Sequence, residues 1–278
     1  MTLEGKTAFV TGGGSGLGAA IATAFAREGA RVLVTDVDEK AAASVAKICE
    51  SKAPGARSAR CDVADSKSVA SAFRELDRHF DGIDILVNNA GIIHRDPDYV
   101  AHLTSVQSSQ VNEILTEGRV KTHWQAVEKL TDEMFDRMLK VHLYGTFYCT
   151  REALPRMRNQ GRGGRIINMG SIMGSASLAG VPDYCAAKGA ILAFTRATAR
   201  ESASFGVLIN AIAPGFIDTP LLVDLDDTSR RMIAMQTPLG RLGNVEEIAG
   251  AAVFLAGPSA SFITGQTISP NGGIYMSQ

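Results

Sequence analysis

Three side chains in the second half of the chain have the chemistry to move a proton to or from a carbinol oxygen. Tyr184 precedes Lys188 by four positions, and Ser171 lies thirteen positions before the tyrosine. A spacing of four places a phenol and an amine on one face of a helix. Because a nearby ammonium stabilises a phenolate, we expect Lys188 to lower the pKa of Tyr184 toward working pH. We therefore predict that Tyr184 is a general acid or base and that Ser171 stabilises the substrate oxygen.

A glycine-rich turn near the start of the chain has the spacing of a pyrophosphate-binding loop. The sequence TGGGSGLG occupies residues 11–18, between a predicted strand and a predicted helix. Gly12 permits a tight turn, and Gly16 and Gly18 let the backbone approach a pyrophosphate and let the helix pack on the strand. The alternative is a strand–helix turn that binds nothing. The candidate cofactor-binding residues of this turn are Gly12, Ser15, Gly16, Leu17 and Gly18.

Asp36 ends the second predicted strand and bears on which dinucleotide would bind. A carboxylate about twenty residues past such glycines accepts hydrogen bonds from the adenosine ribose hydroxyls. The same carboxylate would repel a 2′-phosphate, and neither Ser15 nor Val37 supplies a basic side chain to receive one. The sequence therefore predicts NAD rather than NADP as the cofactor.

Short β-rich runs alternate with helical stretches along most of the chain. Strands are predicted at residues 6–11, 31–35, 56–61, 83–88, 165–169, 207–213 and 266–269, the last as an edge strand. Strands rich in Val, Ile and Leu that alternate with helices are typical of a parallel sheet covered on both faces. We predict the α/β class, a Rossmann-type doubly wound parallel sheet in a single domain over residues 1–278.

Residues 92–130 break this alternation, because no strand is expected between residues 91 and 131. Apolar residues recur there at helical spacing, at Tyr99, Val100, Leu103, Val106, Val111, Ile114 and Leu115. They predict a helix, then a second amphipathic piece over residues 120–130 and a new helix capped by Thr131. The segment follows the strand that carries Asn89, so we hypothesise a lid or wall for the substrate. The alternative is a subunit contact or a surface decoration.

Four of the five histidines fall in or near this segment, at His94, His102, His123 and His142. Asp96 and Asp98 lie among them. Their spacing matches neither HxxxH nor HxH, so we predict solvated histidines and no metal site.

Composition and charge narrow the class of protein. The 278 residues carry a net charge of −1, which favours neither a nucleic-acid partner nor an anionic membrane. No signal peptide or apolar run long enough to span a bilayer is visible. The four cysteines match no CxxC motif, so we expect free thiols and a cytoplasmic location.

The motifs occur together in a fixed order along the chain. They are TGGGSGLG at residues 11–18, Asp62-Val63, Asn88-Asn89-Ala90-Gly91, Ser171, Tyr184 with Lys188, and Pro214-Gly215. This ordered set resembles the short-chain dehydrogenase/reductase family over nearly the whole length. The resemblance implies a seven-stranded sheet and, usually, a tetramer. Relative to the family, residues 92–130 contain an insertion of roughly 25–30 residues, too long for a structureless loop.

The resemblance also implies roles in cofactor binding for residues outside the glycine turn. Asp62 would bind the adenine amino group, with the backbone of Val63 beside it. Asn89 would line the cofactor cleft. Ile217 and Thr219 would contact the carboxamide end of the nicotinamide.

His142 departs from the family pattern. The family usually has V-N-L-x-G in its long helix, where the asparagine seats a water that links the lysine to solvent; residues 141–145 here read VHLYG. By the same resemblance, Lys188 would bind the nicotinamide ribose. Because imidazole can donate and accept a hydrogen bond, we predict that His142 supports the proton relay. The alternative is a core histidine bound only to backbone.

The substrate is constrained only in its general character. By the resemblance, residues 216–223 form the mobile substrate loop, which is mostly apolar, as are Ile172, Met173, Leu178 and Val181 near Ser171. These residues favour a hydrophobic secondary alcohol or ketone, or else simply pack the loop onto the core. We predict an NAD-dependent short-chain alcohol dehydrogenase or carbonyl reductase.

Two other functions remain open. Some relatives with the VHLxG pattern act on hydroxyacyl thioesters, so a 3-hydroxyacyl-thioester dehydrogenase or reductase is one alternative. A catalytically silent NAD-binding regulatory protein is the other. For assembly, the resemblance implies a homotetramer with a dimer interface on helices over residues 133–157 and 184–205.

Overall fold

Seven parallel strands form one sheet in the order β3-β2-β1-β4-β5-β6-β7. The computed structural model describes residues 1–222 and 227–276. The strands are β1 Thr7–Thr11, β2 Arg31–Asp36, β3 Arg57–Arg60, β4 Ile85–Asn88, β5 Gly164–Met169, β6 Val207–Ile212 and β7 Thr267–Ile268. Each begins and ends within two residues of its predicted bounds, and β7 lies at the edge as predicted.

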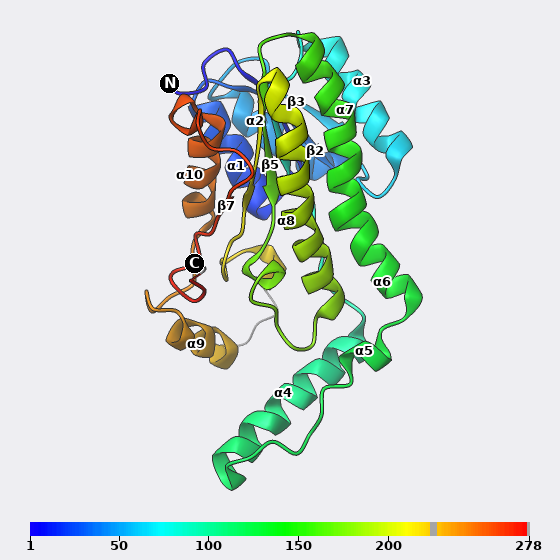
Figure 1. Cartoon of the computed structure of the whole chain (residues 1–278), viewed down its shortest axis with the longest axis vertical. Helices are drawn as coiled ribbons and strands as arrows, with labels where there is room; N and C mark the ends of the chain where they lie inside the picture. Colours follow the sequence, from blue (N-terminus) through cyan, green and yellow to red (C-terminus); the bar gives the residue numbers. More distant parts are fainter. Residues whose placement is uncertain (223–226, 277–278) are drawn as a thin grey trace.

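Helices cover both faces of the sheet (Figure 1). The α-helices of the described residues are α1 Gly16–Arg27, α2 Glu39–Glu50, α3 Ser66–His79, α4 Pro97–Glu117, α5 Ala126–Lys129, α6 Asp132–Leu139, α7 Gly145–Asn159, α8 Pro182–Ser202, α9 Asp227–Gln236 and α10 Val245–Ala256. The predicted single α/β domain with a doubly wound sheet is confirmed. Within the described ranges, no helix is both long and apolar enough to cross a membrane.

Two hydrophobic cores lie on opposite faces of the sheet because side chains alternate along each strand. Ala8 and Val10 of β1 join the core beneath α1, α2 and α10, whereas Phe9 joins the core beneath α3 and α7. Phe9 stacks on Phe73 of α3, with ring centroids 4.4 Å apart. The buried sheet fixes where the strand ends lie, and the strand ends carry the candidate site.

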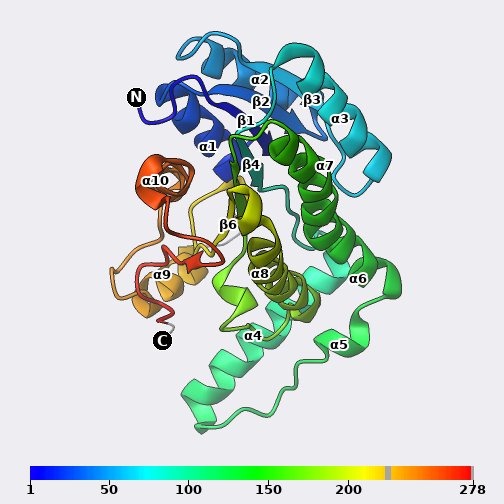
Figure 2. The ribbon, with the colours of Figure 1, turned by 45° about the horizontal axis from the view of Figure 1, so that its top comes forward.

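Residues 92–130 are helical, but less so than predicted. The long helix α4 begins at an Asp96 cap and ends at Gly118, whose φ of 70° is left-handed. It extends away from the sheet (Figures 1 and 2). The second amphipathic piece is reduced to the single turn α5. Residues 118–125 do not continue a helix there because Glu113 of α4 accepts hydrogen bonds from the backbone N–H groups of Lys121 and Thr122, at 2.6 and 2.9 Å.

The predicted cap at Thr131 is confirmed, since its Oγ1 accepts a hydrogen bond from the backbone N–H of Met134 at 3.2 Å. The helix that it starts is not uniform. Between α6 and α7 the backbone passes through η1 Lys140–Tyr144, a π-helical turn with His142 at its centre. A π-turn inserts one residue into an α-helix and is frequent at functional sites.

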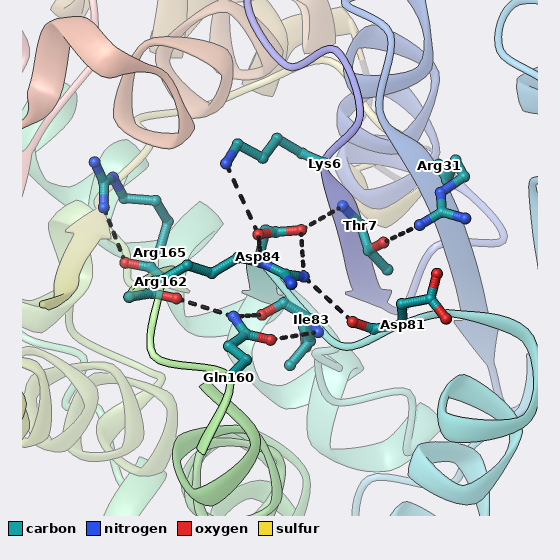
Figure 3. Close-up of polar contacts among 11 residues, drawn as sticks. Lys6, Thr7, Arg31, Asp81, Ile83, Asp84, Gln160, Arg162 and Arg165 are labelled. Atoms are coloured by element: carbon teal, nitrogen blue, oxygen red, sulfur yellow. Dashed lines mark hydrogen bonds and ion pairs between the residues drawn. The ribbon is translucent and has the colours of Figure 1, made fainter. Parts of the chain in front are cut away.

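The predicted motifs follow the carboxyl ends of the strands. At the opposite edge of the sheet, Asp84 links the amino-terminal ends of β1 and β4 (Figure 3). It is only 6% exposed and accepts hydrogen bonds from the Thr7 backbone N–H at 2.9 Å and from Arg162 Nε at 2.8 Å. Lys6 Nζ lies 3.8 Å away. Nearby, the Gln160 carboxamide bonds both backbone groups of Ile83, at 3.2 and 2.8 Å. The network ties the start of β4 to β1 and β5.

We expect Asp84→Asn to lower the free energy of unfolding by about 1–3 kcal/mol, the usual effect of losing hydrogen bonds to a buried charged group. The expected loss of free energy is no larger because the side chains of Lys6 and Arg162 are about half exposed, so water can solvate their charges in the variant. Urea unfolding measures the effect. Asp81→Asn is the matched control, since Asp81 is exposed three positions away. Equal midpoints for the two variants would contradict a structural role for Asp84.

Candidate active site

One cleft of about 920 Å³ opens at the carboxyl ends of the strands. The predicted site residues that line it are Gly12, Ser15, Gly16, Leu17, Asp36, Asp62, Val63, Asn89, His142, Ser171, Tyr184, Lys188, Ile217 and Thr219. Gly18 is the one predicted site residue outside this lining. The topology thus gathers residues as far apart in the sequence as Gly12 and Thr219, as expected for the crevice of an open parallel sheet.

The glycine turn takes the conformation that its sequence predicts. Gly12 and Gly16 have left-handed φ values of 59° and 51°. A Cβ at Gly18 would collide with the Gly12 carbonyl oxygen, so Gly18 lets α1 pack on the turn instead of lining the cleft. The Asn89 side chain donates to the carbonyl oxygens of Thr11 and Gly12, both at 3.0 Å. Asn89 therefore braces the turn as well as lining the cleft.

The amino terminus of α1 faces the same cleft. Its cap residue Ser15 makes no side-chain hydrogen bond to the helix, so the first N–H groups of α1 have no partner from that cap. A hypothetical Cβ at Gly16 has as its nearest neighbours Pro220 at 3.7 Å and Thr219 at 3.9 Å. Free N–H groups at a helix start, next to open space, fit the pyrophosphate of a dinucleotide.

Asp36 is held rigidly at the end of β2. Its two carboxylate oxygens accept hydrogen bonds from the backbone N–H groups of Gly14 at 2.9 Å and Asp38 at 3.0 Å. Each oxygen keeps a further lone pair for a ribose hydroxyl. The basic residues that line the cleft are Arg95, Arg137, Lys140 and Lys188, and none comes from the ends of β2 or β3. The residues present fit a dinucleotide whose ribose carries free hydroxyls.

Ile217 and Thr219 lie across the cleft from β2, after β6. Ile217 is 6% exposed and bridges to Gly243 through backbone pairing. The apolar loop predicted as the substrate loop reaches the lining through Phe216, Pro220 and Leu222 as well. Its last residue, Val223, lies outside the described residues.

Ser171 and Tyr184 meet because the turn after β5 packs tightly on α8. A Cβ at Gly174, in the short helix η2 Ile172–Gly174, would lie 2.8 Å from the carbonyl carbon of Lys188. Ser171 begins this turn and its Oγ accepts a hydrogen bond from the Met173 N–H at 3.1 Å. Lys188 Nζ donates to the Met169 carbonyl at 2.7 Å and lies 5.6 Å from the centre of the Tyr184 ring. The predicted catalytic side chains are therefore neighbours.

The pKa of Tyr184 departs from the expected direction. Burial raises the pKa of the phenol, and a hydrogen bond with Ser171 lowers it only in part. Burial also lowers the pKa of Lys188 from 10.5 to about 7. The expected lowering of the tyrosine pKa by Lys188 was wrong for this structure, because a lysine with that pKa is only partly charged near neutral pH and desolvation of the phenol dominates.

His142 is 2% exposed and lies edge-on to the Tyr184 ring, with centroids 5.4 Å apart. Its Nε2 lies 3.1 Å from the backbone nitrogen of Ile92 and 2.9 Å from the Ile92 carbonyl oxygen. Its Nδ1 is buried and has no hydrogen-bond partner among the described residues. Burial, then Lys188, lowers the pKa of His142 to about 3, so the ring is neutral at physiological pH.

If His142 supports the proton relay, a neutral ring does so by accepting and donating through its two nitrogens. We expect His142→Asn to keep most activity and His142→Ala to lower kcat about 10-fold or more, the low end of what proton-transfer groups contribute. Because the histidine pKa is far below working pH, neither variant should remove an acidic limb near pH 6–7. Kinetics over pH 5–9 measure both, and unchanged rates in both variants would leave His142 a purely structural residue.

The prediction of solvated histidines holds for His123 but was wrong for His142, which is 2% exposed, for His102, whose Nε2 is buried, and for His94. Its side chain is only 10% exposed, and its Nε2 lies 2.7 Å from Oδ2 of the fully buried Asp183. No motif marked Asp183, and the two residues are 89 positions apart, so only the folded chain reveals the pair. Of the described residues in the segment, Ile92, Ile93, His94 and Arg95 line the cleft. The segment thus supplies part of the cleft wall, while α4 packs farther out.

A parallel sheet, a glycine turn at a helix start and a Ser–Tyr–Lys cluster in one cleft define a dinucleotide-binding oxidoreductase. The chain belongs to the short-chain dehydrogenase/reductase family, whose members bind a nicotinamide cofactor: the family described as short chain dehydrogenase matches residues 6–230. The resemblance inferred from the motifs is confirmed.

Individual relatives agree with this assignment. A protein of Vibrio cholerae named 3-oxoacyl-[acyl-carrier-protein] reductase FabG is 36% identical over 276 residues, covering 99% of this chain and 100% of that protein. A protein of the same name from Pseudomonas aeruginosa is 38% identical over 277 residues, covering 100% of both chains. The crystal structure of a short-chain type dehydrogenase/reductase from Mycobacterium marinum has a TM-score of 0.83 and 30% identity, covering 99% of this chain and 97% of that one.

Proposed function

We propose that the protein is an NAD(H)-dependent oxidoreductase that interconverts a secondary alcohol and a ketone. The observation that carries the proposal is the cleft itself, which places Ser171, Tyr184 and Lys188 together with the glycine turn and Asp36. This reaction class needs a proton donor and a nucleotide-binding turn in the same cleft.

Tyr184 acts as the general acid when a ketone is reduced. Because burial raises its pKa, the phenol is protonated at neutral pH and can donate its proton to the carbonyl oxygen. Ser171 donates a hydrogen bond that stabilises the charge developing on that oxygen. A bound nicotinamide cofactor supplies the hydride that the reduction requires.

Lys188 completes this arrangement from the next turn of α8. One of its three N–H groups is held by Met169, so two remain for the ribose hydroxyls of a cofactor. Because the pKa of Lys188 is about 7, hydrogen bonds from its charged form to the ribose hydroxyls would shift its protonation near neutral pH toward the ammonium.

NAD is the proposed form of the cofactor. The support is the fixed carboxylate of Asp36, which matches two ribose hydroxyls and opposes a 2′-phosphate. By the motif positions, Asp62 and Val63 hold the adenine, and Ile217 and Thr219 hold the carboxamide.

Two substrate classes fit the cleft. Its apolar walls, with Ile172, Met173, Leu178 and Val181, suit a hydrophobic secondary alcohol or ketone. A 3-oxoacyl thioester is the second candidate, favoured by the relatives named 3-oxoacyl-[acyl-carrier-protein] reductase. The basic residues Arg95, Arg137 and Lys140 at the cleft would suit the phosphate groups of such a substrate.

A reduction and oxidation screen tests the proposal. NADH and NADPH are offered separately with cyclic ketones, aromatic ketones, hydroxy acids and 3-oxoacyl thioesters, with Tyr184→Phe as the blank. Turnover with NADH that the blank lacks supports the reaction class, and the substrate with the highest kcat/KM names its subclass. Tight NADH binding without turnover of any class would instead favour a catalytically silent NAD-binding protein.

We also propose a homotetramer that works in the cytoplasm. The support for assembly is an aromatic patch on α7 and α8. Phe147 is 40% exposed, and the centroids of the Phe147 and Phe194 rings are 6.4 Å apart. The Arg151 guanidinium carbon lies 5.0 Å from the centroid of the Phe147 ring. Exposed aromatic and arginine side chains are enriched in subunit contacts. Sedimentation as a single monomeric species would contradict the assembly. The four free cysteines are compatible with a reducing compartment.

A further inference from the structure

His94 and Asp183 join two parts of the chain that meet at the cleft wall. His94 follows β4 and lines the cleft, whereas Asp183 lies in the first turn of α8, directly before Tyr184. The imidazole Nε2 and carboxylate Oδ2 are 2.7 Å apart. The contact therefore attaches residues 92–95 to the end of the helix that carries the proposed acid.

Burial makes this contact energetically important. Asp183 is 0% exposed, and its Oδ1 has no hydrogen-bond partner among the described residues. A buried carboxylate is costly unless it is paired and hydrogen-bonded, and His94 is the partner that the structure gives it. Without His94, the Asp183 carboxylate would have no side-chain partner among the described residues, which penalises the present position of the first turn of α8.

A second contact fastens the same segment to the loop before α8. The Tyr99 ring lies edge-on to His94, with centroids 4.9 Å apart, and its hydroxyl donates to the Gly180 carbonyl at 3.1 Å. Gly180 has a left-handed φ of 93°, and a Cβ there would lie 3.1 Å from the Trp124 ring. Tyr99 near the start of α4 and Trp124 after its end therefore both contact the loop that leads into Tyr184.

The other end of the wall is also fixed. The backbone of Ile92 bonds to the His142 ring, and that ring packs on Tyr184. Residues 92–94 are thus held at Ile92 by the helix of His142 and at His94 by α8. The His142 ring packs on the Tyr184 ring, and Asp183 directly precedes Tyr184 in α8.

We propose that His94 is a positioning residue: through Asp183 it holds the first turn of α8, and with it Tyr184, in the reactive arrangement. The segment 92–130 then acts as a brace for the cleft wall and for the acid. The inference rests on the proposed function only in the role of Tyr184; the contact itself can be tested without a substrate.

The experiment compares four variants of the full chain with the parent. His94→Ala removes the partner of Asp183, and His94→Gln keeps an N–H donor near the Nε2 position. The double variant His94→Ala/Asp183→Asn removes both the partner and the buried charge. His123→Ala is the matched control, because His123 is an exposed histidine of the same segment. Amide hydrogen exchange over residues 97–106 and 182–188 is measured with kcat and KM.

In His94→Ala we expect exchange in both regions to speed up by about 5- to 100-fold, the equilibrium effect of leaving a buried acceptor unpaired. kcat should fall about 10-fold or more with little change in KM for the cofactor. His94→Gln should restore much of both, and the double variant should exchange more slowly than His94→Ala. Slower exchange in the double variant would show that the unpaired Asp183 carboxylate causes the opening, and the fall in kcat with unchanged cofactor KM shows that Tyr184 is positioned through it.

Faster exchange with unchanged kcat would overturn the proposal, since the brace would then not position the acid. A lower kcat with exchange equal to His123→Ala would overturn it as well. Should Tyr184→Phe prove as active as the parent, the proposed function fails; exchange that still responds to His94 would then show a brace between the segment and α8 but no positioned acid.

Discussion

Replacing Tyr184 with phenylalanine is expected to lower kcat by about 10²- to 10⁴-fold, the range that a positioned general acid contributes. The substitution removes one oxygen and leaves the ring that packs on His142 and beneath Lys188. NADH affinity, measured by fluorescence quenching, should change little, because the glycine turn and Asp36 lie on other elements. Loss of kcat with retained cofactor binding would identify the phenol as the proton donor.

The neighbouring residue provides the control for this experiment. Cys185 is half-buried on the same helix turn, and its Sγ lies 3.8 Å from the Leu178 carbonyl, outside the Ser171–Lys188 cluster. Cys185→Ser changes the same turn without removing the acid, so its kcat should stay within a few-fold of the parent. A loss below 10-fold in Tyr184→Phe, or an equal loss in both variants, would place the acid elsewhere in the cleft.

The pH dependence should separate Tyr184 from Lys188. In the proposed mechanism, ketone reduction needs the protonated phenol of Tyr184. Because its pKa is raised, we expect the phenol to remain protonated across the neutral range and to lose its proton only at high pH. Lys188, with a pKa of about 7, loses its charge as the pH rises through neutrality unless a ribose stabilises the charged form.

Much of the fold was predictable because it follows from local patterns. Strands rich in Val, Ile and Leu indicate a buried parallel sheet. Side chains alternate along β1, so Ala8 and Val10 lie on one face of the sheet and Phe9 on the other. The position of each motif at a strand end then places it on one edge of the sheet. For that reason the glycine turn, Asp36, Tyr184 and Lys188 could be named from their spacing. The family resemblance supplied Asp62, Val63, Asn89, Ile217 and Thr219, and of all the predicted site residues only Gly18 lies outside the cleft lining.

What could not be predicted depends on contacts between distant residues or on solvation. The π-helical turn at His142 inserts one residue into an otherwise continuous helix, and no residue type in the sequence marks that insertion. Glu113 draws residues 121–122 out of a helix through hydrogen bonds that span eight and nine positions. The direction of the Tyr184 pKa depends on how deeply the phenol and Lys188 are enclosed, a quantity that spacing does not contain.

Changing Asp36 should reverse the proposed cofactor preference. In Asp36→Ser with Val37→Arg, the ribose hydroxyls lose a charged acceptor and a guanidinium can meet a 2′-phosphate. Charged hydrogen bonds contribute about 1.5–3 kcal/mol each, so NADH affinity should fall about 10- to 100-fold while NADPH affinity rises. Titration of both nucleotides by fluorescence, together with KM for each, measures the switch.

Two single variants separate charge from shape. Asp36→Asn keeps oxygen and nitrogen atoms near Gly14 and Asp38 but removes the negative charge, so NADPH should gain affinity even without the new arginine. Asp38→Asn is the matched control, because Asp38 is exposed, caps α2 and lies outside the cleft lining. If Asp36→Asn leaves the ratio of NADH to NADPH affinity at the value of Asp38→Asn, the carboxylate is a structural brace for the turn and selection of the cofactor must come from another part of the cleft.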